Sequence, residues 1–314
     1  MQTQQIIYDV LIAGQGAAAF SAALYAARYQ INSVVIGEIF GGETATGGLI
    51  ENYPGYPEID GFELMMKFRE HAEKYDVPVL DDKVTGISKN NNFFEISTYD
   101  DNLYTARSII LAVGRERRKL GLSNEDEWTG KGVSFCSTCD APLHQGNTVA
   151  VVGGGNAATE GAVLLSKYAN EVYIIYRKPK FTRAEPINIQ LLNKTPNIKQ
   201  ILETNVVELI GNDGLESVVL DKPYNGSSKL SLDGIFIEIG ADPRVDLPNQ
   251  VGLNLNDQNE VIVDKNMNTN VPGIFGAGDL TDASGTLKQT VTAAAQGAIA
   301  ATSAYSYLTK HSSS

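Results

Sequence analysis

Cysteine is scarce in this sequence: the 314 residues contain two, Cys136 and Cys139, separated by Ser-Thr. A secreted disulfide framework needs more cysteines, spread along the chain. A structural zinc site normally takes four Cys or His ligands, and only His144 lies near the pair, so zinc is the weaker alternative. In a cytosolic chain the C-x-x-C spacing favours a redox-active dithiol, and we expect no metal site.

Long apolar runs and an excess of positive charge are also missing. No stretch approaches the ~18 apolar residues of a membrane span. The segment 1–10 has no Lys or Arg before an apolar run, which argues against a signal peptide. The formal charge of −12 argues against nucleic acid and anionic membranes as partners. We therefore expect a cytoplasmic protein, with no nucleic-acid or membrane partner and with length enough for two domains.

One pattern occurs twice in the chain. A strand-like run at 9–13 leads into Gly14-Gln-Gly16, an alanine-rich helical stretch to Arg28 and a second apolar run at 33–36. The second copy consists of a run at 148–152, Gly153-Gly-Gly155, a helix to about Tyr168 and a run at 172–175. Both copies have the strand, glycine turn, helix and strand of a dinucleotide-binding βαβ unit.

The glycines have separate tasks in such a unit. Gly14 and Gly153 permit the tight turn, while Gly16 and Gly155 let a pyrophosphate approach the backbone. The N-terminus of the following helix then faces the anionic phosphates. One G-x-G-x-x-G/A motif is a weak signal, but two in one chain, each between a strand and a helix, are a strong one.

The residue at the end of the second strand of each unit indicates which nucleotide that unit binds. Glu38 lies 24 residues after Gly14, and Arg177 lies 24 residues after Gly153. A carboxylate there suits an unphosphorylated ribose, whereas an Arg suits the 2′-phosphate of NADP(H). Lys178, Lys180 and Arg183 add three cations beside Arg177, although a solvated basic loop is the alternative explanation.

The order of the elements predicts an α/β fold: two Rossmann-like dinucleotide-binding domains, the second inserted in the first. Residues 1–116 and 244–314 form the first domain and 117–243 the second, with crossings near 115–118 and 241–244. The remaining expected elements are strands at 93–98, 108–113, 205–210, 217–220 and 234–240, strand-and-turn segments at 257–263 and 273–279, and a helix at 290–308.

Several local motifs now point to one family. The segment Ser134-Phe-Cys136-Ser-Thr-Cys139-Asp140, shortly before Gly153, resembles the active-site segment of low-molecular-weight thioredoxin reductases from bacteria and archaea. Gly41-Gly42 with Glu51-Asn52-Tyr53-Pro54-Gly55 and Gly276-Ala-Gly-Asp279 with Lys288-Gln289 are similar to the flavin-contacting stretches of these flavin-dependent pyridine nucleotide-disulfide oxidoreductases. The resemblance extends from about Tyr8 to Leu308.

The resemblance implies a homodimeric NADPH-dependent thioredoxin-disulfide reductase. It implies that Cys139 faces the flavin, that Cys136 attacks the disulfide of a thioredoxin-like partner, and that Asp140 exchanges protons with the dithiol; a turn or cap role for Asp140 is the alternative. The implied FAD contacts are Gly14, Gly16, Ala17, Glu38, Gly42, Asn52, Gly114, Asp279, Lys288 and Gln289. The implied NADPH contacts are Gly153, Gly155, Asn156, Ala157, Arg177, Lys178 and Arg183.

The sequence departs from the family at four points. Ala157 stands where a Ser or Thr is usual, Tyr176 replaces a His, the basic loop is one residue longer, and Glu43 replaces a Gln. The first three leave the electron donor open, with reduced ferredoxin or reverse operation as a dithiol oxidase as alternatives. A ferredoxin–NADP reductase and a non-enzymatic nucleotide-binding redox sensor are more remote, and the former has no use for the C-x-x-C pair.

Overall fold

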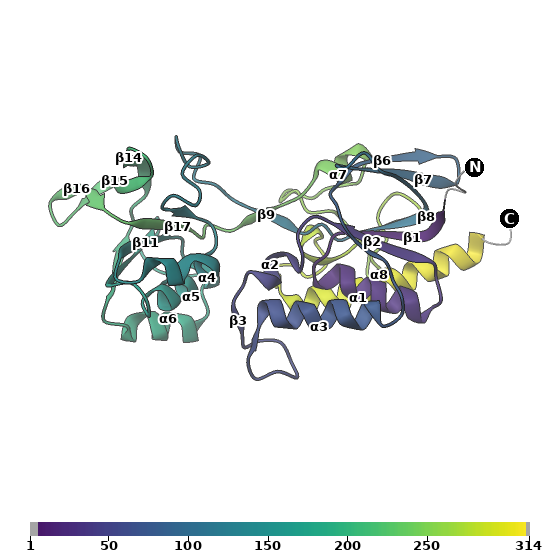
Figure 1. Ribbon diagram of the computed structural model, residues 1–314, viewed down its shortest axis with the longest axis horizontal. Coiled ribbons are helices and arrows are strands. Elements are labelled where there is room, and N and C mark those ends of the chain that lie inside the picture. Colours follow the sequence, from purple (N-terminus) through teal and green to yellow (C-terminus); the bar gives the residue numbers. More distant parts are fainter. Residues whose placement is uncertain (1–5, 312–314) are drawn as a thin grey trace. The chain divides into compact units, whose positions relative to one another are not determined.

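The computed structural model describes residues 6–311 and divides the chain into two compact units. Unit 1 consists of Met1–Glu116 with Pro243–Ser314, and unit 2 of Arg117–Asp242. Figure 1 shows the purple start and the yellow end of the chain in the same unit, while the teal middle forms the other. The segment considered above for a signal peptide is only half described, because residues 1–5 lie outside the described range. Within residues 6–311 no helix is long and apolar enough to span a membrane.

Unit 1 is built on a seven-stranded sheet with the order β5-β2-β1-β8-β7-β6, to which β19 adds beside β8. The β1 strand pairs in parallel with both β2 and β8. Its Val10 lies opposite Ser33 of β2 and opposite Ser108 of β8. The strands are β1 (Ile7–Ala13), β2 (Ser33–Gly37), β5 (Val79–Asp81), β6 (Val84–Asn90), β7 (Phe93–Thr98), β8 (Leu103–Leu111) and β19 (Ile274–Gly276).

Small residues let two helices approach each other closely in unit 1. A Cβ atom at Gly297 of α8 (Thr290–His311) would lie 2.0 Å from the carbonyl oxygen of Ala18 in α1 (Ala17–Arg28), so only glycine fits this crossing. Figure 1 shows both helices, with α3 (Gly61–Glu73), along one face of the sheet. The short elements are α2 (Gly42–Ala45), β3 (Leu49–Ile50), β4 (Ile59–Asp60), α7 (Asp246–Gln250) and η2 (Gly278–Leu280).

Unit 2 has a parallel five-stranded sheet with the order β10-β17-β11-β12-β13 and an antiparallel sheet β14-β15-β16. Its strands are β10 (Val133–Ser134), β11 (Thr148–Val152), β12 (Glu171–Tyr176), β13 (Ile198–Leu202), β14 (Val206–Gly211), β15 (Leu215–Tyr224), β16 (Ser227–Ser231) and β17 (Gly234–Ile237). Its helices are α4 (Ser137–Asp140), η1 (Ala141–His144), α5 (Asn156–Leu165) and α6 (Pro186–Lys194).

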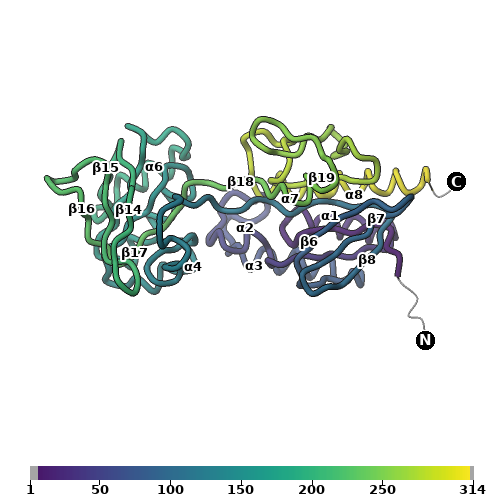
Figure 2. The backbone as a smooth tube through the Cα atoms, turned by 90° about the horizontal axis from the view of Figure 1, so that it is seen from above, coloured from purple at the N-terminus to yellow at the C-terminus, as the bar shows by residue number. Residues whose placement is uncertain are grey.

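The chain passes between the units through two short strands, β9 (Arg115–Arg117) and β18 (Ala241–Pro243), which pair with each other. Within unit 1 the amide of Arg244 donates to the carbonyl of Gly114 at 3.1 Å. Within unit 2 the amide of Arg118 donates to the carbonyl of Gly240 at 2.9 Å. The tube in Figure 2 allows both passages of the chain to be followed at β18.

The predicted α/β fold with two Rossmann-like units is confirmed, and several boundaries are corrected. The second glycine-motif helix ends at Leu165 rather than near Tyr168, because the amides of Lys167 and Tyr168 bond three residues back in a tightening turn. Residues 257–263 form no strand: the side-chain oxygen of Asn256 accepts from the amides of Gln258 and Glu260 and closes a turn instead.

Candidate functional site

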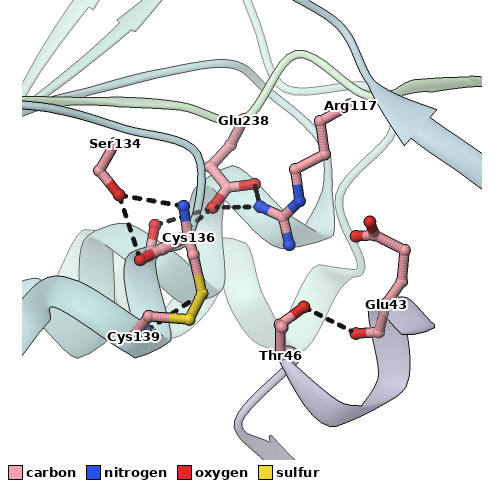
Figure 3. The surroundings of a disulfide bond; sticks show 8 residues. Glu43, Thr46, Arg117, Ser134, Cys136, Cys139 and Glu238 are labelled. Carbon is pink, nitrogen blue, oxygen red and sulfur yellow. Dashed lines mark hydrogen bonds and ion pairs between the residues drawn. A yellow bond between two sulfur atoms is a disulfide. The ribbon is translucent and has the colours of Figure 1, made fainter. Parts of the chain in front are cut away.

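Cys136 and Cys139 form a disulfide at the start of α4, with their Cα atoms 5.3 Å apart. Cys136 is the N-cap of this helix, and its Sγ atom accepts a hydrogen bond from the amide of Cys139 at 3.2 Å. The hydroxyl of Ser134 accepts from the amide of Cys136 at 3.0 Å and so fixes the entry of the chain (Figure 3). Cys139 is exposed and Cys136 is half-buried, so the disulfide can be reached from outside unit 2.

Asp140 ends α4 and stands at the N-cap of η1, where its carboxylate makes no capping hydrogen bond. His144 lies four residues after Asp140. Burial lowers the pKa of its imidazole, although the charges of Asp140 and Asp233 oppose this shift, so the imidazole is neutral at pH 7. The His144 ring packs edge-on against Phe236 at 5.2 Å and fills the space that a side chain at Gly234 would need. His144 therefore acts in packing, and both cysteine sulfurs are taken up by the disulfide rather than by a metal.

The two glycine loops have the same geometry. Gly14 and Gly153 have φ values of 121° and 149°, and a Cβ atom at either would lie 2.2 Å from a carbonyl oxygen, of Ala112 and Glu238 respectively. Neither position accepts a side chain. A Cβ atom at Gly16 or Gly155, in contrast, would meet no protein atom within 4 Å. The first glycine of each loop thus lies directly against the end of the neighbouring strand, β8 for Gly14 and β17 for Gly153. The other glycine, Gly16 or Gly155, has open space above it.

That open space adjoins a helix N-terminus in both units. Gly16 is the N-cap of α1 and Gly155 the N-cap of α5, and neither cap offers a side-chain hydrogen bond to the first helical amides. Ala17, Asn156 and Ala157 provide the first amides. Uncapped helix amides next to an open glycine backbone fit a pyrophosphate group, so each unit has the cradle that a dinucleotide requires.

The basic segment follows directly after β12. Among residues 6–311, Arg177, Lys178, Lys180 and Arg183 have exposed side chains and form no ion pair. Tyr176 is buried: its ring stacks on Phe181 at 5.4 Å, and a Cβ atom at Gly154 would lie 2.3 Å from it. The aromatic pair therefore anchors the loop while its cations remain available to an anion.

In unit 1 the structure brings together several residues that the resemblance assigns to the flavin. Gly42 packs on Gly16, with 3.6 Å between an added Cβ and the Gly16 Cα. The side-chain amide of Asn52 donates to the side-chain oxygen of Gln289 at 3.2 Å. Burial raises the pKa of Asp279, an effect that the charges of Arg115 and Lys288 oppose. Arg115 and Lys288 both pair with Glu260, so the half-buried Asp279 carboxylate lies within the influence of two cations and is suited to hydrogen bonds with a polar ligand.

The remaining predicted flavin contacts in unit 1 are Glu38, Lys288 and Gly114. Glu38 follows β2, and its exposed carboxylate pairs with Lys83 at 3.4 Å. Lys288 donates to Glu260 at 2.9 Å and to the carbonyl of Thr281. Gly114 adopts a φ of 64°, which a non-glycine residue rarely does, at the point where the chain leaves β8 for β9.

The matched dinucleotide cradles and the exposed disulfide agree with a comparison against known families. A model described as "Pyridine nucleotide-disulphide oxidoreductase" matches residues 8–297. The chain belongs to the pyridine nucleotide-disulphide oxidoreductase family. The oxidoreductase is 36% identical over 300 residues to a thioredoxin reductase of Mycoplasma genitalium, a match covering 94% of each chain.

Solved structures place the oxidoreductase in the same part of the family. It is similar to the thioredoxin reductase of Lactococcus lactis, with a TM-score of 0.90 and 35% identity over 96% of this chain and 99% of that one. It is also similar to the T. acidophilum thioredoxin reductase, with a TM-score of 0.87 and 37% identity over 96% and 98% of the two chains. The resemblance to thioredoxin reductases inferred from the motifs is confirmed.

Sequence reasoning missed one charged residue of the oxidoreductase beside the disulfide. The carboxylate of Glu238 accepts hydrogen bonds from the hydroxyl and the amide of Ser137, the residue after Cys136. Its other contact is an ion pair with Arg117. The available signal was a single carboxylate inside the apolar run 234–240, since a charge at the end of a buried strand needs a partner.

Proposed function

We propose that this oxidoreductase is an NADPH-dependent thioredoxin-disulfide reductase that uses FAD. The observation that carries the proposal is the Cys136–Cys139 disulfide, exposed at a helix start in the same unit as the Gly155 cradle. A disulfide that can be reached from outside is suited to exchange with another protein, whereas a structural disulfide is normally buried. The family supplies the pyridine nucleotide link.

Unit 1 is the proposed FAD domain. The backbone at Gly16 and the amides that begin with Ala17 would receive the pyrophosphate, while Asn52, Asp279 and Gln289 would contact polar atoms of the flavin part. Glu38 would turn from Lys83 to the adenosine ribose. The residues still proposed as FAD contacts on the resemblance alone are Gly42, Gly114 and Lys288. When bound, FAD accepts a hydride from the nicotinamide and passes an electron pair to a disulfide.

Unit 2 is the proposed NADPH domain. Gly153 and Gly155 would seat the pyrophosphate with the amides of Asn156 and Ala157. The exposed Arg177, Lys178 and Arg183 would surround the 2′-phosphate. Charge-assisted contacts of this kind contribute about 1.5–3 kcal/mol each, more than the single neutral hydrogen bonds lost at Ala157 and Tyr176. NADPH is therefore the favoured donor despite those two departures.

The dithiol chemistry conserves electrons and protons at each step. Two electrons and two protons convert the Cys136–Cys139 disulfide into two thiols. Cys136 then gives up its proton, and its thiolate attacks one sulfur of the partner disulfide to form a mixed disulfide, while the partner's other sulfur leaves as a thiolate that takes up that proton. Cys139 then loses its proton and attacks the Cys136 sulfur of the mixed disulfide, which restores the internal disulfide and expels the partner's second sulfur as a thiolate. That thiolate takes up the proton, with Asp140 as the proposed proton carrier.

Anaerobic titration of the flavin-loaded protein tests the donor. Parallel additions of NADPH, NADH and reduced ferredoxin are followed by the loss of flavin absorbance, and oxidised thioredoxin is then added to measure reoxidation. We expect reduction by NADPH at far lower concentrations than by NADH, and reoxidation by thioredoxin. Fast reduction by ferredoxin with none by either nucleotide would support the ferredoxin-linked alternative. Sedimentation of the same sample tests the homodimer that we propose for the protein.

A further inference from the structure

The buried carboxylate of Glu238 lies at the N-terminus of the disulfide helix. It accepts from the hydroxyl of Ser137 at 2.9 Å and from the amide of Ser137 at 3.3 Å. Ser137 is the first residue of α4, so Glu238 takes up a helix amide next to the N-cap Cys136. The Glu238 side chain is only 8% exposed, and its charge is therefore poorly screened by water.

Arg117 balances that charge. Its Nη1 atom lies 3.3 and 3.4 Å from the two carboxylate oxygens of Glu238, and its side chain is 22% exposed. Figure 3 shows the guanidinium facing the carboxylate next to the backbone of Cys136. The dithiol turn thus has the Glu238–Arg117 pair beside it, in addition to the carboxylate of Asp140, which directly follows Cys139.

The backbone of Glu238 holds this carboxylate in place. Its amide donates to Val152 at 2.8 Å, and its carbonyl oxygen is the atom that excludes a side chain at Gly153. Glu238 therefore joins the glycine loop, through its backbone, to the disulfide turn, through its side chain. Such a residue has little freedom to move its charge away when the disulfide opens.

The charge pair bears directly on thiol exchange. A nearby carboxylate disfavours a thiolate, whereas a nearby guanidinium favours it. We infer that Glu238 and Arg117 are a positioning pair that sets how readily Cys136 becomes a thiolate once the disulfide is reduced. The inference rests on the proposed function only for the role of Cys136 in exchange.

The test measures alkylation of the chemically reduced protein. The full-length protein is reduced with a phosphine, trace-labelled with iodoacetamide across a pH series, and the label is assigned to Cys136 by fragmentation mass spectrometry. Glu238→Gln keeps an oxygen that accepts from Ser137 and removes only the charge. Arg117→Gln removes the opposite charge, and the double variant removes both.

We expect opposite effects from the two single variants. We expect one unbalanced charge beside the turn to shift the pKa of the Cys136 thiol by about one unit, which is about tenfold in the thiolate population. Because a less basic thiolate is also a weaker nucleophile, the net change in rate is about three- to fourfold. Labelling of Cys136 at neutral pH should rise by that factor in Glu238→Gln and fall by it in Arg117→Gln. The double variant should return close to the wild type.

A matched control is the exposed ion pair of Arg118 and Asp242 in the same unit. Asp242→Asn should leave the alkylation profile unchanged, because water and salt screen an exposed pair. Rates that change in the same direction in both single variants, or no recovery in the double variant, would overturn the inference. A phosphine reduces the disulfide without nucleotide or flavin, so failure of the NADPH titration leaves this result unaffected.

Discussion

Replacement of Gly155 by Ala should separate nucleotide binding from folding. The backbone there has φ −100° and ψ −172°, which alanine adopts freely, and the added Cβ meets no protein atom within 4 Å. The free energy of unfolding should therefore stay within about 1 kcal/mol of the wild type. The methyl group would occupy the space proposed for the pyrophosphate. Loss of one charge-assisted backbone contact costs about 1.5–3 kcal/mol, or about tenfold to more than a hundredfold in affinity.

Gly153→Ala is the structural contrast. Its Cβ would lie 2.2 Å from the Glu238 carbonyl oxygen, at a φ of 149° that alanine rarely adopts. This variant should lose about 3 kcal/mol or more of stability in unit 2. In unit 1 the counterpart of Gly155→Ala is Gly16→Ala, which should reduce FAD content and leave NADPH affinity intact.

The assay combines denaturant unfolding with titration calorimetry of NADPH. We expect Gly155→Ala to unfold like the wild type, to retain FAD and to bind NADPH at least tenfold more weakly. Wild-type NADPH affinity in this variant would refute the reasoning, because it would mean that no phosphate approaches the open backbone at Gly155. Equal losses of stability in Gly153→Ala and Gly155→Ala would refute it as well.

Three further predictions address the dithiol, the basic loop and the turn that Glu125 holds in unit 2. Cys136→Ser and Cys139→Ser should each abolish thioredoxin reduction but not flavin reduction. Absorbance spectra should show a long-wavelength charge-transfer band only in Cys136→Ser, which keeps Cys139. A band in Cys139→Ser instead would reverse the roles assigned to the two cysteines. The double variant Arg177→Ala, Arg183→Ala should raise the KM for NADPH at least tenfold more than the KM for NADH in steady-state kinetics. Equal effects on the two KM values would mean that the basic loop is only a solvated surface. The buried carboxylate of Glu125 accepts from the three backbone amides of residues 120–122, so Glu125→Ala should cost about 2–4 kcal/mol in urea unfolding. A loss below about 1 kcal/mol would contradict that role.

Local pattern was enough to predict the two βαβ units. The glycine spacing and the apolar runs specify a strand, a turn and a helix within some thirty residues, and the structure has them as β1 with α1 and β11 with α5. The end of α5 was harder to predict, because Ser166 and Lys167 suit a helix by composition and only their hydrogen bonds show the tightening turn.

Contacts between distant segments could not be read from the sequence. Ser137 and Glu238 are 101 positions apart, and no periodicity links a serine inside C-x-x-C to a carboxylate at the end of a strand. The same holds for Asn52 and Gln289, which the resemblance gave as separate flavin contacts and the structure joins by a hydrogen bond. Pairings of this kind depend on tertiary packing, which brings the ends of neighbouring strands together.

The paired crossings β9 and β18 make the inserted unit severable. The hydrogen bond from Arg118 to Gly240 holds the two ends of unit 2 together, and the one from Arg244 to Gly114 holds together the two chain ends that the insertion leaves in unit 1. Paired strands lie about 4.8 Å apart, a gap that a short turn can span. Unit 1 could thus be closed by a tight turn between 114 and 244, and unit 2 circularised or transplanted, without long linkers. The two units of this polypeptide are therefore joined by the two-stranded ribbon of β9 and β18, and this ribbon is where the chain would be cut and rejoined to obtain either unit alone.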